Sequence, residues 1–412
     1  MASREIEQKV QAQYEQYPYP LRSHDDDAER VGQDLSPLES LRIMQHYGQG
    51  GRAPSRPLRI LVAGGGTGDA TVGLGCQLQQ TSNGGEIVHL DLSEAAIGVT
   101  IERVERMDIR NVSYWHRSLL DIGPDELGTF DYINCSGVLH HLPDPWAGVR
   151  ALRRLLNVDG VLGAMVYGPY GRNGLYQAQE LLRRLTNGYS TADAITIARR
   201  VLARLPKRHP LASNGHVGFS PTLSDNEIVD RYLHPCDQAF SVPQIVQWMQ
   251  ETGMRVVDFT PSIQYNPALL VADPWMIGSI ARMPLFDRYA MAELWSFHLD
   301  RHSFFAVRDD NPVRPLEPGP DVVAHVVQAH RIARSLQEEN ALQWVIGGAT
   351  FKVPLAPTPL HWRIFGALDD RRTLGAVARD LEVSWDRFID VFLDLYTPLQ
   401  GAGYMTLSDP MG

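Results

Sequence analysis

The stretch ILVAGGGTGDATV, residues 60–72, decides the fold, because it places four glycines in five positions directly after an aliphatic run. Each glycine raises the entropy cost of ordering the backbone. Such a cluster therefore marks a tight turn, or a place where a ligand approaches the main chain closely. The stretch predicts a strand, a turn and the beginning of a helix.

Short apolar segments alternate with helical segments on both sides of this turn, from Leu58 to about Gly168. The strand candidates are LRILVA, EIVHLDL, VSYWHRS, FDYINCS and VLGAMVYG. Alternation of this kind predicts right-handed crossovers and an α/β fold with a doubly wound, mostly parallel sheet. The later segments MRVVDF and HSFFAVR are expected to complete the same sheet.

The composition divides the chain into six parts. We expect an N-terminal helical arm, a Rossmann-like core, a helical insertion that covers the substrate, the remaining core with a further helical insertion, linker helices, and a winged-helix-like domain. In that order they span residues 1–50, 51–168, 169–235, 236–310, 311–354 and 355–412. The last part is expected to contain three helices and a terminal, hairpin-like strand.

Charge and cysteine content exclude several classes of partner. The net charge is -10 with both signs interspersed, so the chain offers no electrostatic footprint for nucleic acid or an anionic membrane. The three cysteines are odd in number and widely spaced, which favours reduced thiols. The start MASREIEQKV is no secretory signal, and no run of about 18 apolar residues occurs. We therefore expect a cytoplasmic protein, with a homodimer left open.

The glycine spacing points to a ligand. Gly64, Gly66 and Gly68 form G-x-G-x-G, whereas a dinucleotide turn requires G-x-G-x-x-G or A. This spacing fits S-adenosylmethionine better than NAD, because its carboxylate and amino group approach the turn in place of a pyrophosphate. An acidic residue for the ribose is expected about 20 residues on, and Asp91 occupies that place. The alternative is that Asp91 caps the helix that begins near Ser93.

These segments resemble the class I S-adenosylmethionine-dependent methyltransferases over about residues 10–310. The matching segments are LRILVAGGGTGDATV, VHLDLSEAAI, FDYINCSGVLHHLPDPWAGVRALRRLLNVDGVL and MVYGPYGR. YEQYPYPLR, YGPYGRNGLYQAQELL, VDRYLHPCDQAFSVPQIVQWMQETGM and HLDRHSFFAVR are similar to a bacterial subgroup. That subgroup includes tetratricopeptide-repeat-fused enzymes and lysine methyltransferases of outer-membrane proteins. The C-terminal segment resembles a regulatory domain of some members.

The resemblance implies S-adenosylmethionine as cofactor and S-adenosylhomocysteine as product. It implies that the three glycines line the methionine end, that Asp91 binds the ribose and that Leu92 packs on the adenine. The other expected cofactor residues are Ser118, Leu119 and Ser136. Two positions depart from the family pattern. Val62 precedes the turn where an acidic residue is usual, and Ser118 stands where an aspartate often meets the adenine amino group.

Methyl transfer needs little acid–base chemistry, because the sulfonium is already an activated electrophile. The protein mainly positions the acceptor, excludes water and, for some acceptors, removes a proton. His140 and His141 in GVLHHLPDP follow the fourth strand and are the candidate bases, with Tyr19 as a further catalytic candidate. The alternative for His141 is a structural hydrogen bond.

The acceptor site is expected among aromatic residues, histidines and one arginine. The candidates are Tyr14, Tyr17, Tyr167, Tyr170, Arg172, Tyr176, His234, His298 and His302. The tyrosines of YEQYPYPLR suit a lid over the sulfonium, or else simply pin the arm to the surface. His298 and His302 are four apart and would share a helix face, but no Glu stands between them in the zincin arrangement, and no metal is expected.

Three functions follow from these patterns. The first is methyl transfer to a small molecule, with the arm and the helical insertion enclosing the acceptor. The second is methylation of a protein lysine. The third, a non-catalytic S-adenosylmethionine-sensing regulator that binds DNA, is disfavoured because residues 363–396 carry more acids than bases.

Overall fold

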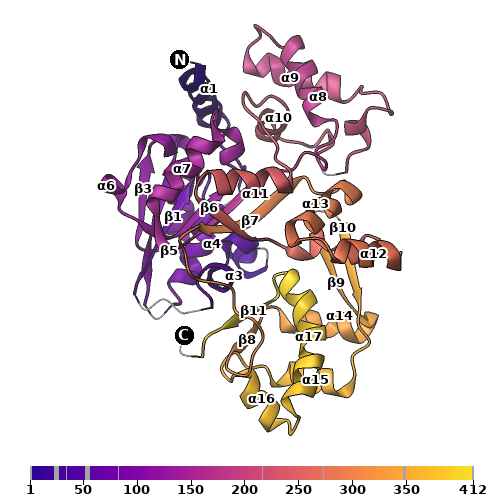
Figure 1. Cartoon of the computed structure of the whole chain (residues 1–412). Coiled ribbons are helices and arrows are strands. Elements are labelled where there is room, and N and C mark those ends of the chain that lie inside the picture. The colour runs from indigo at the N-terminus through magenta and orange to yellow at the C-terminus, as the bar shows by residue number, and fades with distance from the viewer. Residues whose placement is uncertain are drawn as a thin grey trace.

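A seven-stranded sheet forms the centre of the molecule (Figure 1). The computed structural model describes residues 2–22, 27–33, 35–51, 56–81, 83–215, 217–271, 273–346 and 349–410. The strands are β1 (Leu58–Ala63), β2 (Gly85–Asp91), β3 (Val112–His116), β4 (Phe130–Ser136), β5 (Leu156–Tyr167), β6 (Met254–Phe259) and β7 (Arg301–Arg308). Their order is β3-β2-β1-β4-β5-β7-β6, and β7 alone runs antiparallel. The predicted doubly wound, mostly parallel sheet is confirmed.

Strand β1 shows why the sequence forms this sheet. Ile60 and Val62 pack into the apolar cluster on one face, and Leu61 and Ala63 pack into the cluster on the other face. Side chains alternate across a strand, so a strand covered on both faces reads as a continuous apolar run. LRILVA is such a run, and it lies between β2 and β4 in the middle of the sheet.

Helices cover the sheet, and α5 (Glu94–Arg106), α7 (Pro145–Leu155) and α12 (Pro274–Ala281) begin at residues whose side chains cap them. The helices that follow core strands are α4 (Asp69–Leu78), α5, α6 (Pro124–Leu127), α7, α11 (Val242–Glu251), α12 and α13 (Leu285–Ser296). The hydroxyl of Ser93 accepts a hydrogen bond from the Ala96 amide and caps α5. Ser93 therefore does the capping that was the alternative role for Asp91.

The N-terminal arm contains α1 (Ala2–Gln16) and continues to Arg22, and α2 (Asp27–Gln33) and α3 (Leu41–Gly48) follow it. Part of the acidic run at residues 25–30 and part of the linker at residues 48–57 lie outside the described residues. Helix α1 packs against α5, and α3 packs against β5 and β7. The arm therefore lies beside the sheet edge where the parallel strands end.

The helical insertion forms a cap with its own core (Figure 1, upper part). It consists of α8 (Leu175–Leu185), α9 (Thr191–Leu202) and α10 (Asp225–Tyr232). Leu182, Ile195 and Ile228 meet in a small apolar cluster separate from those of the sheet. The cap is thus a distinct packing unit between β5 and α11.

The C-terminal module differs from the expected division of the chain. Its elements are β8 (Val323–Val326), α14 (Ala329–Glu339), β9 (Ala341–Ile346), β10 (Ala349–Pro354), α15 (Pro359–Ala367), α16 (Leu374–Asp380), α17 (Trp385–Gly401) and β11 (Met405–Ser408). Residues 311–354, expected to be linker helices, hold one helix and three strands and share an apolar core with α15–α17. The terminal strand β11 pairs with the distant β8 and does not form a local hairpin.

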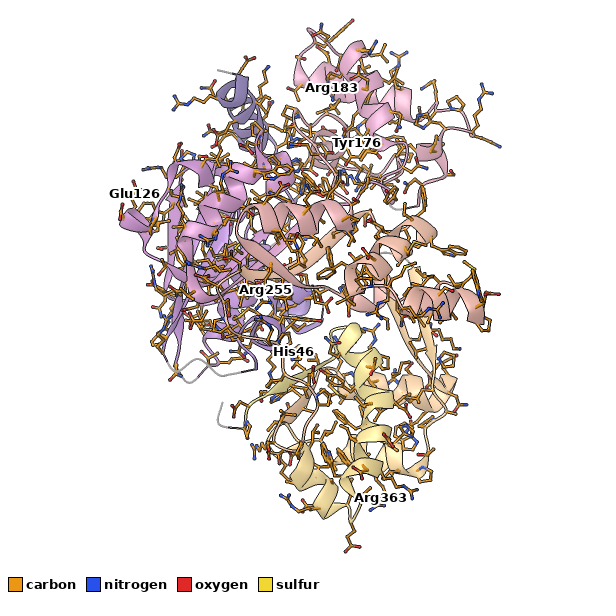
Figure 2. The ribbon with its side chains drawn as sticks, viewed as in Figure 1. His46, Glu126, Tyr176, Arg183, Arg255 and Arg363 are labelled. Carbon is orange, nitrogen blue, oxygen red and sulfur yellow. The ribbon has the colours of Figure 1, made fainter. Side chains whose placement is uncertain are left out.

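The module docks on the core through α3. The Leu407 amide of β11 donates to His46 Nδ1 at 3.3 Å, and the Gln400 side chain donates to the Tyr47 hydroxyl at 2.7 Å. Figure 2 shows His46 at this junction. In the part of the chain that the structure describes, no helix is both long and apolar enough to cross a membrane.

Candidate active site

A cavity of about 340 Å³ lies where β1, β2, β3, β4 and β5 end. In an open α/β sheet, ligands bind at this edge, because the loops after neighbouring parallel strands meet there. Eleven of the predicted site residues line it: Tyr14, Tyr19, Gly64, Gly66, Asp91, Leu92, Ser118, Leu119, Ser136, His141 and Tyr167. The cavity is therefore built from the arm and the ends of the sheet strands.

The glycine turn leaves its backbone open to the cavity. Gly64 and Gly66 have φ values of 68° and 54°, a left-handed conformation that favours glycine. A Cβ on Gly64 would lie 2.3 Å from a Val138 methyl carbon, and a Cβ on Gly66 would lie 2.8 Å from the Tyr19 carbonyl oxygen. Gly68, also predicted for the cofactor site, is the N-cap of α4 and is not among the lining residues.

Asp91 joins the turn after β1 to the end of β2. Its Oδ2 accepts a hydrogen bond from the Gly66 amide at 2.7 Å, and its Oδ1 accepts one from the Ser93 amide at 2.9 Å. Burial raises the pKa of Asp91, although these backbone hydrogen bonds favour its charged form. Each carboxylate oxygen keeps a lone pair for a ligand hydroxyl.

We expect Asp91→Ala to weaken S-adenosylhomocysteine binding by about 1–3 kcal/mol, because a buried hydrogen-bonding carboxylate is lost. Isothermal titration calorimetry measures the change. Asp108→Ala is the matched control, since Asp108 is exposed and lies in the turn after α5. Unchanged affinity in Asp91→Ala would remove Asp91 from the site.

The arm is held over the glycine turn by both the core and the cap. The Thr67 hydroxyl donates to the Pro20 carbonyl at 2.7 Å, and the Asn226 amide group donates to the Pro18 carbonyl at 2.6 Å. Tyr19 thereby lines the cavity, and burial raises the pKa of its hydroxyl to about 12. Tyr17 packs against the core of the cap and does not line the cavity.

A buried carboxylate that sequence reasoning missed also lines the cavity. Asp230 of α10 is 5% exposed, and its Oδ1 accepts a hydrogen bond from the Tyr14 hydroxyl at 3.0 Å. Burial raises the pKa of Asp230 and raises that of Tyr14 well above its usual value. Asp230 and Tyr167 both line the cavity, so the cap, the arm and the sheet meet there.

The two neighbouring histidines have different surroundings. His141 lines the cavity, and its Nδ1 lies 2.8 Å from the Cys236 carbonyl oxygen. A carbonyl oxygen only accepts, so Nδ1 carries the proton and Nε2 of the neutral ring keeps a lone pair. His140 is fully buried against the Tyr167 ring at a centroid distance of 3.9 Å and is not a lining residue. Burial lowers the pKa of His140 well below its usual value.

Arg172 contacts Tyr167, which lines the cavity. Its guanidinium lies 3.5 Å from the centroid of the Tyr167 ring and pairs with Asp237 at 3.2 Å. Tyr176 lies in the cap (Figure 2), and the Arg172 guanidinium is 5.9 Å from its ring centroid. Tyr170 packs on Phe297 at a ring centroid distance of 5.5 Å. None of these three predicted acceptor residues lines the cavity.

The expected helical pair of histidines is not formed. His298 follows the end of α13, and His302 lies in β7, where its Nδ1 is 2.8 Å from the Tyr265 hydroxyl. Neither lines the cavity. His234 is not a lining residue either, but its ring stacks on His141 at 3.8 Å and so supports it. Within the described ranges, no group of three His, Cys, Asp or Glu side chains is arranged to hold a metal ion.

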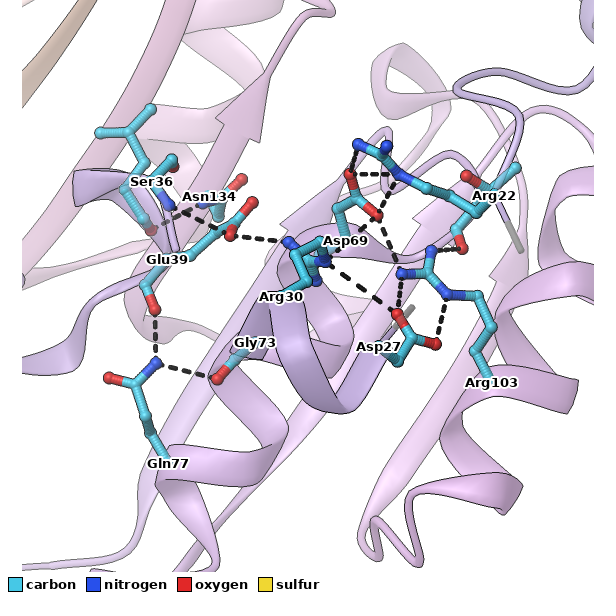
Figure 3. Close-up of polar contacts among 12 residues, drawn as sticks. Arg22, Asp27, Arg30, Ser36, Glu39, Asp69, Gly73, Gln77, Arg103 and Asn134 are labelled. Atoms are coloured by element: carbon cyan, nitrogen blue, oxygen red, sulfur yellow. Dashed lines mark hydrogen bonds and ion pairs between the residues drawn. The ribbon is translucent and has the colours of Figure 1, made fainter. Parts of the chain in front are cut away.

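A network of charged side chains fixes the segment after the arm to α4 and α5 (Figure 3). Asp69 accepts hydrogen bonds from Arg22 at 3.0 Å and from Arg103 at 2.9 Å. The fully buried Arg103 also donates to Asp27 at 2.9 Å. Arg22 and Asp69 line the cavity, as does Glu39. Asp69 lies in the glycine-rich stretch, but no motif marks Arg22, Asp27 or Arg103, since their partners are distant along the chain.

Comparisons with known proteins agree with this geometry. Residues 61–162 match a family model described as a methyltransferase domain. An uncharacterized protein of Synechococcus is 28% identical over 319 residues, which cover 74% of this chain and 73% of that protein. The ubiquinone biosynthesis O-methyltransferase of Acinetobacter baylyi is 23% identical over 223 residues, covering 53% of this chain and 75% of that enzyme.

The fold is also that of a solved structure. PKMT2 from Rickettsia typhi is similar with a TM-score of 0.61 at 14% identity, over 90% of this chain and 75% of that chain. Its complex with AdoHcy gives the same TM-score of 0.61 at 16% identity, over 91% of this chain and 75% of that chain.

The sheet and the cavity have the arrangement of the Rossmann-like methyltransferase fold. Residues 61–162 are a methyltransferase domain of the S-adenosylmethionine-dependent kind, and S-adenosylmethionine is its cofactor. The site fits this group, since the glycine turn leaves its backbone open and Asp91 lies beside it. Among the residues that the structure describes, those that line the cavity lie between Glu7 and Arg301, and none of them belongs to the C-terminal module.

Proposed function

We propose that the protein transfers a methyl group to a small-molecule acceptor by in-line displacement. One observation carries this proposal: Tyr14 of the arm, Tyr167 of β5 and Asp230 of the cap enclose one end of the cavity. Enclosure excludes water and orients a compact acceptor. The three cysteines are free thiols, which supports a cytoplasmic location.

The cofactor half of the cavity offers a partner for each part of the cofactor. We propose that Gly64 and Gly66 contact its methionine end and that Asp91 binds the ribose. Leu92 and Leu119 supply apolar surface for the adenine. Arg22, Glu39 and Asp69 supply charges of both signs near the turn. These charges suit the zwitterionic methionine end of the cofactor. The two carboxylates offset the lack of an acidic residue at position 62, where the chain has Val62.

The acceptor half of the cavity positions the acceptor and receives its proton. When bound, the cofactor supplies an electrophilic methyl group. For an acceptor that loses a proton, Nε2 of His141 takes it, because Nδ1 is fixed as a donor to the Cys236 carbonyl. Arg172 does not line the cavity, and its guanidinium holds the Tyr167 ring in place by packing against the face of that ring. Tyr19 covers the glycine turn and excludes water.

A protein lysine is the second candidate acceptor, and Asp230 favours it. A buried carboxylate among tyrosine rings suits an ammonium group, through both ion pairing and cation–π attraction. A lysine side chain is also slender enough for an enclosed site. Both candidate acceptors could present a small group to the cavity. They differ in whether the rest of the acceptor, outside the cavity, is a small molecule or a protein.

Label transfer separates the two candidates. The enzyme is incubated with tritiated S-adenosylmethionine and a cell lysate divided into a small-molecule fraction and a protein fraction. We expect the label in the small-molecule fraction. Label in protein that survives as methyllysine after hydrolysis would favour the second candidate. Absence of transfer to either fraction, at concentrations that saturate cofactor binding, would contradict both.

We expect Asp230→Asn to raise the KM for the acceptor identified in this way by about tenfold, because a charge-assisted contact becomes a neutral one. The S-adenosylhomocysteine affinity should not change. Asp225→Asn is the matched control, since Asp225 lies on the same helix and is largely exposed. An altered cofactor affinity with an unchanged KM would move Asp230 out of the acceptor half.

A further inference from the structure

One face of α1 carries a row of polar side chains that bind the core. Glu7, Gln11 and Glu15 are spaced four residues apart, so they lie along the same side of the helix. The Gln11 side chain donates to the Leu92 carbonyl at 3.0 Å. The Glu15 carboxylate accepts from the Glu94 and Ala95 amides at 2.7 and 3.0 Å, at the positive end of α5. These contacts fix the rotation and position of α1.

The first residue of this row lies at the cavity. Glu7 accepts a hydrogen bond from the Ser118 hydroxyl, and both residues line the cavity. Ser118 has one hydroxyl hydrogen, which it gives to Glu7, and its oxygen already accepts from the Leu120 amide at 3.2 Å. Ser118 therefore holds Glu7 in place and has no hydrogen left for a ligand. The Glu7 carboxylate is an acceptor with no donor of its own.

The order of the strands indicates which part of the nucleoside reaches Glu7. The glycine turn follows β1, Asp91 ends β2, and Ser118 follows β3, the edge strand beyond β2. With the amino-acid end at the turn and the ribose at Asp91, the base extends toward β3. Val10, Leu92 and Leu119 give the cavity apolar walls on that side. Glu7 lies in the wall at the same end.

We propose that Glu7 accepts a hydrogen bond from the exocyclic amino group of the adenine and so makes the site selective for adenosine. This inference rests on the proposed function, since it assumes that the cavity holds S-adenosylmethionine. A carboxylate meets an amino group with a charge-assisted hydrogen bond. Against a purine with a carbonyl at that position, oxygen lone pairs face each other, and a site built in this way rejects the analogue. Glu7 of the N-terminal helix thus supplies the acidic acceptor that the family pattern usually has at the position of Ser118.

The test compares two ligands on the full chain by calorimetry. S-adenosylhomocysteine carries the amino group, and S-inosylhomocysteine carries a carbonyl oxygen at the same position. We expect the wild type to bind the first at least about tenfold more tightly. Glu7→Gln should lose most of this preference, because a carboxamide both accepts from an amino group and donates to a carbonyl.

Glu5→Gln is the matched control, because Glu5 lies on the same helix, pairs with Lys9 at 2.8 Å and is exposed. It should keep the wild-type preference. If Glu7→Gln also keeps it, the inference about Glu7 is overturned while the proposed function stands. If the wild type binds neither nucleoside, the proposed function itself fails. The two failures are therefore distinguishable by ligand binding alone.

Discussion

Removing residues 1–22 is expected to lower methyl transfer by at least about 100-fold, because the acceptor and the cofactor lose the wall that positions them. This segment contributes Tyr14 and Tyr19 to the cavity, together with Glu7, Pro20 and Arg22. It contributes nothing to the apolar clusters on the two faces of the sheet. The sheet should therefore fold without it, and the loss should be one of function.

Three measurements check this result. Circular dichroism should be near that of the wild type, S-adenosylhomocysteine should bind more weakly, and tritium transfer to the acceptor fraction should disappear. A chain that lacks only residues 1–4 is the control, since the contacts of α1 with the core begin at Glu7. It should retain activity. Full activity without residues 1–22 would show that the arm is only pinned to the surface of the core and has no part in methyl transfer.

Arg103→Ala is expected to lower the free energy of unfolding by about 3–5 kcal/mol, because it leaves the buried Asp27 carboxylate with only the longer ion pair to Arg30 at 4.0 Å. Arg103 is 0% exposed, and Asp27, which it pairs with, is 3% exposed. Arg103 also donates to the Thr67 carbonyl and to Asp69, so its loss frees the segment around the glycine turn. The expected effect is large because the Arg103 and Asp27 side chains are both shielded from water.

Urea unfolding of the full chain measures the change. Arg110→Ala is the control, since Arg110 is 75% exposed in its pair with Asp108, and it should shift the unfolding free energy by no more than about 0.5 kcal/mol. Adding Asp27→Asn to Arg103→Ala should recover part of the lost free energy of unfolding, because it removes the buried negative charge of Asp27. Equal free energies of unfolding for Arg103→Ala and Arg110→Ala would mean that water reaches the Arg103–Asp27 pair.

The sheet was predictable from the sequence because its strands are covered on both faces. Ile60 to Ala63 gives a continuous apolar run, and the turn that follows needs residues that tolerate positive φ. Asp91 was found by its distance from that turn, since one crossover helix separates the ends of neighbouring parallel strands. These signals are local, or nearly so. The assignment of these residues to the cofactor stays a prediction.

Other features depend on contacts between distant segments. The pairing of β8 with β11 joins four-residue strands near residues 325 and 406, too short and too far apart for a periodic pattern. His302 was expected both at the start of the strand segment HSFFAVR and on a helix face with His298, and its pairing with β5 puts it in β7. Asp230 and Glu7 have no motif, and only the packing of the cap and the arm brings them to the cavity. A sequence alone does not show such contacts between distant segments.

The position of Tyr19 across the glycine turn has a kinetic consequence. Its carbonyl oxygen lies so close to Gly66 that even a methyl group there would touch it, and Pro18 and Pro20 are each held by a hydrogen bond. We therefore expect a bound nucleoside to exchange with solvent when this stretch detaches. The detachment rate sets the residence time of the spent cofactor and puts a ceiling on turnover, whatever the speed of the chemical step.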